Sequence, residues 1–266
     1  MIRGYSGKVA VVTGAARGLG RAFVDELAAR GCHIVPIDLD TADVSCEKSV
    51  QAAAETVKTQ YGTIDLLINN AGISISAAFS KTASADFDRV VHVNFLGAVY
   101  MCRAFLPLFV DGGQILNVVS CFAWLGFPGK TAYAATKGAL KSFSDSLRIE
   151  LAPCGIGVTQ LYPGPLATDI VFAGVAESEE ARRREHEFLQ QRGLPVDRVA
   201  KRALNKLVRN PARIVVGRDY LALDWLARLL PASAGKIAAR AARDASRDSQ
   251  GRTSGALLQT KSAPGS

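Results

Sequence analysis

The chain has 266 residues, of which 48% are hydrophobic and 21% charged, a composition typical of a soluble globular protein with one large core. No run approaches the roughly 20 uninterrupted apolar residues that span a bilayer, and the N-terminal stretch MIRGYSGKVAVVTG does not resemble a secretory signal. The five cysteines are widely spaced and the three histidines have no neighbour at metal-ligand spacing, so we expect neither disulfides nor a metal site.

The net charge of +8 is concentrated near the C-terminus. Residues 201–266 carry 13 Lys and Arg against 4 Asp, whereas residues 1–200 carry 19 basic and 20 acidic residues. After about residue 232 the chain turns to Ala, Ser, Gly, Arg and Lys, a composition that cannot build a core. We therefore expect one domain over residues 1–232 and a basic, disordered tail over residues 233–266.

Short apolar runs alternate with longer helical patterns along the chain. Buried strands are expected at 9–13, 33–37, 64–69, 114–120, 157–162 and 213–217. Helices are expected at 18–30, 46–60, 86–109 and 132–152, with Gly31 and Gly62 as C-terminal stops. This alternation, with strands apolar on both faces, predicts an α/β domain built on a doubly wound parallel sheet.

The first expected strand runs into TGAARGLG, residues 13–20, and then into a helix. Gly14, Gly18 and Gly20, with Leu19 between the last two, permit a tight turn and a close approach of the backbone to a ligand. Free N–H groups at the start of the helix would then face a phosphate. Ordinary loops also contain glycines and the spacing is not GxGxxG, but the position between strand and helix favours a dinucleotide site.

Asp38 ends the second strand, 18 residues after Gly20, where an acidic side chain can bind the adenosine ribose hydroxyls. Its carboxylate would repel a 2′-phosphate, which favours NAD over NADP. Arg17, inside the glycine turn, could instead reach a phosphate, or could be a solvated loop charge. We expect NAD as the cofactor and keep NADP as the alternative.

The stretch AYAATKG, residues 132–138, places Tyr133 and Lys137 four residues apart on one face of an expected helix. A nearby ammonium favours the phenolate, and a phenolate can take a proton from an alcohol. A Tyr and a Lys on a solvated helix face would give the same pattern. The pair alone therefore does not establish chemistry, which needs a constellation of groups.

Taken together, TGAARGLG, NNAG (69–72), VNFLG with Asn94, Ser120, YAATK and YPGPLAT (162–168) resemble the short-chain dehydrogenase/reductase family over roughly residues 7–170. Ser120 precedes Tyr133 by 13 residues, the usual interval in that family. The resemblance implies a Rossmann fold with Tyr133 as general acid/base and Ser120 as a hydrogen-bonding partner of the substrate oxygen. Lys137 would lower the Tyr133 pKa and hold the nicotinamide ribose, and Asn94 would shape its helix so that a water joins a proton relay with Lys137.

The same resemblance implies further cofactor contacts, from Asn70, Ala71, Gly72, Pro163, Gly164 and Thr168. The NNAG segment would steady the central sheet and line the adenosine ribose. The YPG turn follows a strand, and the threonine after it would contact the nicotinamide carboxamide. Hydride would go to the nicotinamide face that is directed at Ser120 and Tyr133.

The chain departs from the family pattern in two places. PIDLDTADVS passes from the second strand to the family-like DVS with almost nothing between, so a helix and a strand are missing or reduced. Asp43 resembles the acid that contacts adenine, but this shortening changes its surroundings. The usual C-terminal VDGG is absent, which argues against the tetramer contact it often makes, while helices 86–109 and 132–152 could form a homodimer.

The substrate side would be walled by apolar residues after Ser120, namely Phe122, Trp124, Leu125 and Phe127, or some of these would pack in the core or at a dimer contact. The heavily charged stretch 176–192 is interpreted as a solvated helix or a mobile lid. These features favour an apolar secondary alcohol or ketone as the substrate.

The segment 220–231 puts Leu221, Trp225 and Leu229 on one side of an expected helix, followed by basic residues. We expect this helix to cap the substrate mouth and the tail after it to be dispensable for chemistry. Peripheral contact with an anionic membrane is a less favoured alternative. Nucleic-acid binding is not expected, because no aromatic residue follows Trp225 among the basic residues.

The sequence therefore predicts a cytoplasmic oxidoreductase that moves hydride between NAD and an apolar secondary alcohol or ketone. Two alternatives remain: an NADP-dependent carbonyl reductase, and a non-catalytic NAD-binding regulator on the same fold.

Overall fold

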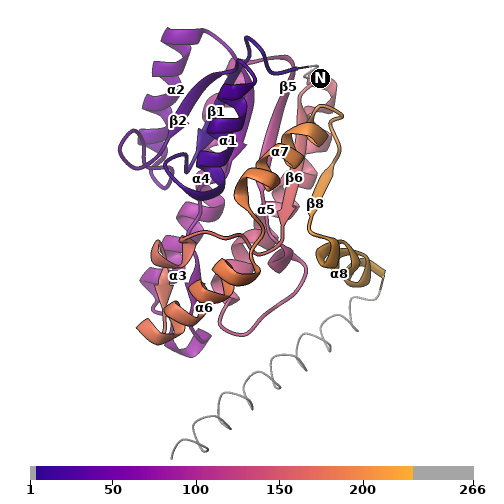
Figure 1. Cartoon of the computed structure of the whole chain (residues 1–266). Helices are drawn as coiled ribbons and strands as arrows, with labels where there is room; N and C mark the ends of the chain where they lie inside the picture. The colour runs from indigo at the N-terminus through magenta and orange to yellow at the C-terminus, as the bar shows by residue number, and fades with distance from the viewer. Residues whose placement is uncertain (1–3, 230–266) are drawn as a thin grey trace, which may run out of the picture.

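A six-stranded parallel sheet runs through residues 4–229, the part of the chain that the computed structural model describes (Figure 1). Its strands are β1 (Val9–Thr13), β2 (His33–Ile37), β3 (Ile64–Asn69), β5 (Phe109–Val118), β6 (Gly157–Pro163) and β8 (Arg213–Val216), in the order β2-β1-β3-β5-β6-β8. Every pairing is parallel. The predicted doubly wound α/β fold is confirmed, and the expected strands are found within a few residues of their predicted bounds.

Helices cover both faces of this sheet (Figure 1). Helices α1 (Gly18–Ala29) and α7 (Val196–Leu207) pack on one face, where Phe23, Leu27 and Leu204 are fully buried against strand side chains. Helices α2 (Glu47–Tyr61), α4 (Gly97–Phe105) and α5 (Thr131–Leu151) pack on the other face, around Phe105. Two separate apolar layers thus hold the sheet rigid between them.

Strand β2 lies at the edge of the sheet, so the prediction of a buried strand at 33–37 is wrong for most of its residues. Only Ile37 is buried, and His33 and Pro36 are exposed. Proline suits an edge strand because it has no N–H to donate to a further neighbour. The edge arises because no strand follows β2 before α2.

The predicted shortening after β2 is confirmed. Between Ile37 and the start of α2 at Glu47 the chain makes only turns, with no intervening helix or strand. The shortened loop lies directly on α4, where a Cβ on Gly97 would meet side-chain and backbone atoms of Val44 at 3.1–3.3 Å. Glycine at this position lets the loop approach the helix closely, and the loop carries Asp43 toward the ligand-binding edge.

The expected helix 86–109 is interrupted. Helix α3 (Ser84–Val91) passes into one π-helical turn (His92–Leu96), then into α4, and ends in a 3-10 turn (Leu106–Leu108). The whole run Ser84–Leu108 is long and apolar enough to cross a membrane by length and composition. Here it lies against the sheet with Val90, Met101 and Phe105 buried in the core, which gives its apolar residues an ordinary structural role.

A smaller subassembly sits beside the carboxyl ends of the strands. Strands β4 (Ile75–Ser76) and β7 (Val175–Ala176) form a two-stranded parallel sheet, and helix α6 (Glu179–Arg192) follows β7. None of the 14 residues of α6 is buried, as the charged composition of the stretch predicts. Four 3-10 turns complete the described elements: Phe79–Lys81, Cys121–Ala123, Ala152–Cys154 and Ile170–Phe172.

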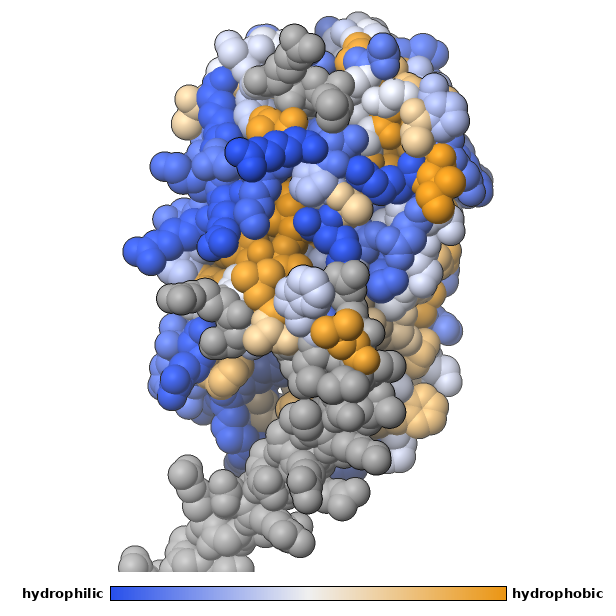
Figure 2. Space-filling model, turned by 90° about the vertical axis from the view of Figure 1, so that its right-hand side faces the viewer, coloured by the Kyte–Doolittle hydropathy of each residue, from blue (hydrophilic) through white to orange (hydrophobic). Residues whose placement is uncertain are grey.

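Helix α8 (Arg218–Leu229) confirms the helix expected near residue 220, but not the predicted burial of its apolar stripe. Leu221, Trp225 and Leu229 are 37%, 58% and 69% exposed, so this stripe does not cap the cavity. The opposite side of the helix faces the fold, where Asp224 pairs with Arg213 of β8 at 2.5 Å. Figure 2 views the β8 and α8 side, where apolar side chains reach the surface among hydrophilic ones. The predicted tail, 233–266, lies outside the described residues.

Candidate active site

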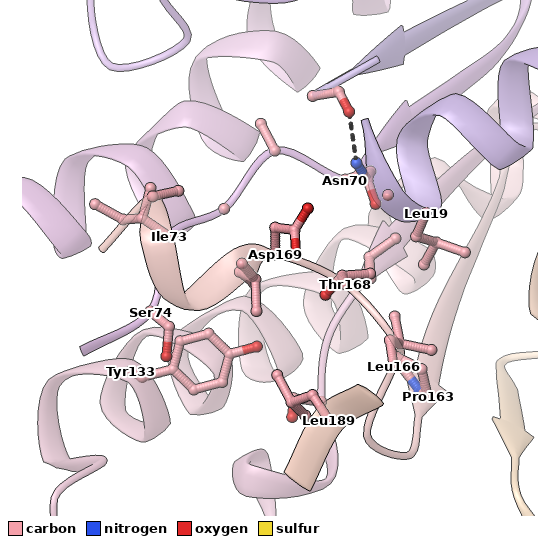
Figure 3. A pocket seen from close by; sticks show the side chains of 18 of the residues that line it. Leu19, Asn70, Ile73, Ser74, Tyr133, Pro163, Leu166, Thr168, Asp169 and Leu189 are labelled. Carbon is pink, nitrogen blue, oxygen red and sulfur yellow. Dashed lines mark hydrogen bonds between the residues drawn. The ribbon is translucent and has the colours of Figure 1, made fainter. Parts of the chain in front are cut away.

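One large cavity opens at the carboxyl ends of the central strands, the edge where parallel α/β sheets bind ligands (Figure 3). Its volume is about 1790 Å³, more than the roughly 300–1,000 Å³ of a single small-molecule site. The predicted residues that line it are Gly14, Arg17, Gly18, Leu19, Asp38, Asp43, Asn70, Ala71, Gly72, Ser120, Tyr133, Lys137, Pro163, Gly164 and Thr168. The cavity thus has room for a dinucleotide and a second molecule.

Two predicted residues lie behind the cavity wall rather than on it: Gly20 and Asn94. A Cβ on Gly20 would stand 1.9 Å from the carbonyl oxygen of Gly14, so the third glycine of the turn is required by packing. Gly14 and Gly18 have φ of 63° and 57°, a region that favours glycine.

The first turn of α1 is suited to an anion. Arg17 occupies the N-cap position and its side chain makes no capping hydrogen bond. The leading N–H groups of α1 are therefore not satisfied by that side chain, and Gly18 and Leu19 of this first turn line the cavity. Together with the close glycine packing, this arrangement fits the pyrophosphate of a dinucleotide.

The NNAG segment is fastened to β1 through Thr13. The Thr13 hydroxyl accepts hydrogen bonds from the backbone N–H groups of Asn70 and Ala71, both at 3.0 Å. The Asn70 amide in turn donates to the Thr13 carbonyl at 2.9 Å. Deeper in the sheet, Asn69 donates to Asn117 of β5 at 2.8 Å. The carboxyl ends of three adjacent strands are thereby cross-linked, as the predicted steadying role requires.

The two acidic residues expected at the adenosine end both line the cavity. Asp38 accepts hydrogen bonds from the backbone N–H of Ala16 at 2.8 Å and of Leu39 at 2.9 Å, so it also fixes the glycine turn. Asp43 accepts from the backbone N–H and hydroxyl of Ser45 at 2.8 and 2.7 Å. The shortened loop therefore still brings both carboxylates to the same end of the cavity.

Asn94 lies in the π-helical turn and holds the backbone of Ile73 with both ends of its amide. Its Oδ1 accepts from the Ile73 N–H at 2.8 Å, and its Nδ2 donates to the Ile73 carbonyl at 2.9 Å. A π turn of this kind leaves backbone groups free for other partners, which is why such turns are frequent at functional sites. The Lys137 ammonium lies nearby: a Cβ on Gly72 would be 3.3 Å from Asn94 Oδ1 and 3.7 Å from Lys137 Nζ.

Lys137 is buried and donates to the Val118 carbonyl at 2.8 Å. Its Nζ lies 5.7 Å from the centre of the Tyr133 ring, so the helix spacing does bring the two side chains together. Burial lowers the pKa of Lys137 from its ordinary 10.5 to about 8, because removal from water disfavours the charged form.

The Tyr133 pKa differs from the sequence-based expectation. Burial raises the pKa of Tyr133 above its ordinary value, a hydrogen bond with Ser120 opposes this, and the charges of Cys121 and Glu185 add to the rise. In the protein without cofactor, desolvation therefore outweighs the expected lowering by Lys137. The neutral phenol is the form that this environment favours.

The segment after β6 closes the opposite wall. The side chain of Thr168 would be 3.3 Å from a Cβ on Gly18, so the segment lies directly over the glycine turn. The Gly164 N–H donates to the Val216 carbonyl at 3.0 Å. Tyr220 of α8 packs against Gly164, where a Cβ would be 2.7 Å from its ring, and it lines the cavity.

The expected apolar substrate wall is present in part. Phe122, Leu125 and Phe127 line the cavity, and the Phe122 ring meets the Tyr133 ring edge-on at 6.1 Å. Trp124 turns away and stacks on Tyr162 at 4.5 Å, with the Arg213 guanidinium 5.3 Å from its ring. Trp124 therefore packs in the core, which is one of the positions that the sequence left open for it.

Sequence reasoning missed several residues of the cavity. Lys130, Glu185 and Tyr220 line it, and Thr13 and Asn117 hold the strand ends behind it. Lys130 lies three residues before Tyr133 but outside the expected helix 132–152, because it is the N-cap residue of α5. The position of Glu185 depends on a contact between distant segments, which no local pattern reveals.

Comparison with known proteins places the chain in a family. The family model described as short chain dehydrogenase matches residues 36–178. The SadH protein of Mycobacterium tuberculosis is 32% identical over 262 residues, covering 88% of this chain and 95% of that protein. A short chain dehydrogenase/reductase from Burkholderia phymatum in complex with NAD matches with a TM-score of 0.74 at 26% identity, covering 83% of this chain and 92% of that one.

A short chain dehydrogenase from Burkholderia cenocepacia in complex with NADP gives a TM-score of 0.71 at 25% identity, covering 86% and 96% of the two chains. The fold, the glycine turn and these matches agree. The chain belongs to the short-chain dehydrogenase/reductase family of oxidoreductases. The related structures include both an NAD and an NADP complex.

The depressed pKa of Lys137 predicts a pH dependence of stability. Between pH 8 and 10.5 the native protein binds fewer protons at Lys137 than the unfolded chain, so this residue makes stability rise with pH over that window. Lys137→Met removes this contribution. Between pH 8 and pH 10.5, the free energy of unfolding should therefore increase more in the wild type than in Lys137→Met, by about 3 kcal/mol at most.

The measurement is denaturant unfolding of both proteins at the two ends of the window. Other titrating groups are common to both proteins and cancel in the difference. An equal pH dependence in the two proteins would show that burial does not lower the pKa of Lys137.

Proposed function

We propose that the protein is an NAD-dependent dehydrogenase or reductase that interconverts an apolar secondary alcohol and its ketone. The observation that carries the proposal is the convergence of Ser120, Tyr133 and Lys137 on one wall of a cavity whose other end has a phosphate-binding turn. Nicotinamide, when bound, supplies or accepts the hydride. The rest of the chemistry is proton transfer and positioning, which the side chains of this chain would perform.

Tyr133 would move the proton at its phenolic oxygen. Its neutral form, favoured by burial in the protein without cofactor, suits protonation of a ketone oxygen in the reductive direction. Alcohol oxidation needs the phenolate instead, and the charged Lys137 beside the ring would favour that form. Ser120, which contributes a hydrogen bond to Tyr133, would hold the substrate oxygen next to the phenol.

Lys137 and Asn94 would complete a path for the proton away from Tyr133. Lys137 already donates to the Val118 carbonyl, and an ammonium has three donors in all, which leaves donors for a ribose hydroxyl and a water. The Asn94 side chain lies near this ammonium, since a Cβ on Gly72 would be 3.3 Å from Asn94 Oδ1 and 3.7 Å from Lys137 Nζ. This arrangement supports the relay role proposed for the two residues.

The preference for NAD rests on Asp38. Its carboxylate stands at the adenosine end of the cavity, and it accepts two backbone hydrogen bonds that hold it there. A 2′-phosphate placed beside a fixed carboxylate would be repelled. Arg17 is exposed and also lines the cavity, and it is the feature that supports the NADP alternative.

The substrate class follows from the walls near Tyr133. Phe122, Leu125, Phe127 and Phe188 line this region, so a bulky apolar group would bury its surface there. A non-catalytic NAD-binding regulator on the same fold is the rival proposal. The presence of all four side chains needed for proton transfer favours an enzyme.

Two further expectations complete the proposal. The helices α4 and α5 could form a homodimer contact, which would cover Ile149 of α5, a residue that is 76% exposed. The family resemblance and the reduced cysteines also support a cytoplasmic location.

Replacement of Tyr133 tests the proposed chemistry. Tyr133→Phe keeps the ring and its edge-on contact with Phe122 but removes the phenolic oxygen. Turnover of a secondary alcohol should fall by about 10²–10⁴-fold, the usual contribution of a general acid/base, while NADH affinity stays within a few-fold of the wild type. Steady-state kinetics and fluorescence titration with NADH measure the two quantities, and near-normal turnover would exclude the mechanism.

The cofactor preference is tested with Asp38→Ala. Loss of the carboxylate should weaken NAD binding and relieve the repulsion of NADP, so the ratio of kcat/KM values for the two cofactors should move toward NADP. In Arg17→Ala the same ratio should move toward NAD, because Arg17 is the residue that could bind the 2′-phosphate of NADP. A wild-type enzyme that already prefers NADP would contradict the assignment of Asp38.

A further inference from the structure

A largely enclosed ion pair, Lys130 with Glu185, lies in the wall of the cavity, outside the proton-transfer residues described above. The Lys130 ammonium donates to Glu185 Oε1 at 2.5 Å, to the Ser76 hydroxyl at 2.5 Å and to the Ser74 hydroxyl at 3.1 Å. Glu185 also accepts a hydrogen bond from Ser76 through its other oxygen. All three donors of the ammonium are therefore occupied, and its charge is balanced by one carboxylate.

The pair joins three segments around the substrate end of the cavity. Lys130 is the N-cap residue of α5, the two serines come from the segment of β4, and Glu185 comes from α6. The side chains of Lys130 and Glu185 are only 10% and 23% exposed. This pair is more enclosed than the other ion pair that joins α6 to the rest of the described fold, His186–Asp169, whose side chains are 28% and 63% exposed.

The pair is close to the proposed chemistry. Lys130 precedes Tyr133 by one helical turn, and the charge of Glu185 contributes to the raised pKa of Tyr133. Ser74, Tyr133 and Leu189 of α6 project into the same part of the cavity (Figure 3). A substrate held against Tyr133 would therefore meet this wall.

We propose that Glu185 is a specificity-determining residue: by pairing with Lys130 it cancels the positive charge that this lysine would otherwise present to a substrate beside Tyr133, so the enzyme selects uncharged alcohols and ketones over carboxylate-bearing ones. The inference rests on the proposed function and deepens it. A lone buried ammonium would attract an anion strongly, because few waters compete for it. With Glu185 in place, both oxygens of the carboxylate face the Lys130 cluster, and a second carboxylate brought to the same place would find no free donor and a like charge.

The test compares two alcohols of similar size that differ in charge: 4-methylcyclohexanol and 4-hydroxycyclohexanecarboxylate. The measured quantity is the ratio of kcat/KM for the anionic alcohol to that for the neutral one, with the full-length protein. The wild type should favour the neutral alcohol. Glu185→Gln keeps the shape of the side chain and should raise the ratio by about tenfold or more, because it leaves Lys130 without its counter-charge.

Three further variants separate charge selection from a structural role. Lys130→Met leaves the carboxylate unpaired and should move the ratio in the opposite direction. The double variant Lys130→Met/Glu185→Gln removes both charges and should bring the ratio back toward the wild-type value. Glu180→Gln removes the same charge from an exposed position on the same helix and should leave the ratio unchanged.

A second readout does not need turnover. Calorimetric titration with cyclohexanecarboxylate should show binding to Glu185→Gln and little or none to the wild type or Glu180→Gln. If the wild type oxidised neither alcohol, the proposed function would fail, but this titration would still decide whether Glu185 sets the charge preference. A parallel fall of kcat/KM for both alcohols, an unchanged ratio or equal binding of the carboxylate would overturn the proposal.

Discussion

The hydrogen bonds between Asn94 and the backbone of Ile73 are the constraint on which the site depends. Asn94 is buried within a π turn of the long α3–α4 helical run, and its amide holds both the N–H and the carbonyl of one residue after β3. This contact fixes the segment that follows NNAG relative to the helical layer. Helix α5 packs beside it, with Lys137 Nζ near the Asn94 side chain, so the distance between the strand ends and the helix that carries Tyr133 is set here.

The same region explains why a polar site can persist inside a tightly packed fold. A buried ammonium is costly unless it has hydrogen-bond partners, and Lys137 has the Val118 carbonyl while Lys130 has two serines and Glu185. The two lysines thus stand in different electrostatic settings a short distance apart on α5. Of these two lysines, only Lys130 pairs with a carboxylate among the ion pairs of the described residues, which leaves the Lys137 ammonium available to a cofactor.

The shortened segment after β2 shows how the fold tolerates a departure from its family pattern. Loss of a helix and strand makes β2 an edge strand, and Pro36 and the exposed His33 suit that position. The loop that remains packs on Gly97 and delivers Asp38 and Asp43 to the cavity. The adenosine end of the site therefore keeps its acidic residues although the surrounding sheet is smaller.

Local patterns in the sequence were sufficient for the strands, the glycine turn and the Tyr133–Lys137 pair, because each depends on neighbours within a few residues. Helix α7 was missed although Val199, Ala203 and Leu207 recur at helical spacing, since its many charged residues obscured the pattern. The exposed stripe of α8 was predicted to be buried, because helical spacing shows which residues share a face but not what that face meets. The Lys130–Glu185 pair joins residues 55 apart, a contact that only the folded chain defines.

The central claim is that the wall formed by Ser120, Tyr133 and Lys137 supports hydride transfer between an alcohol and nicotinamide. The most direct test is to incubate the full-length protein with NAD and a secondary alcohol that carries deuterium on its carbinol carbon. The account predicts that deuterium appears at C4 of the nicotinamide, on one face only, as the ketone forms. Binding of NAD without any transfer of the label, across a panel of apolar alcohols, would contradict it.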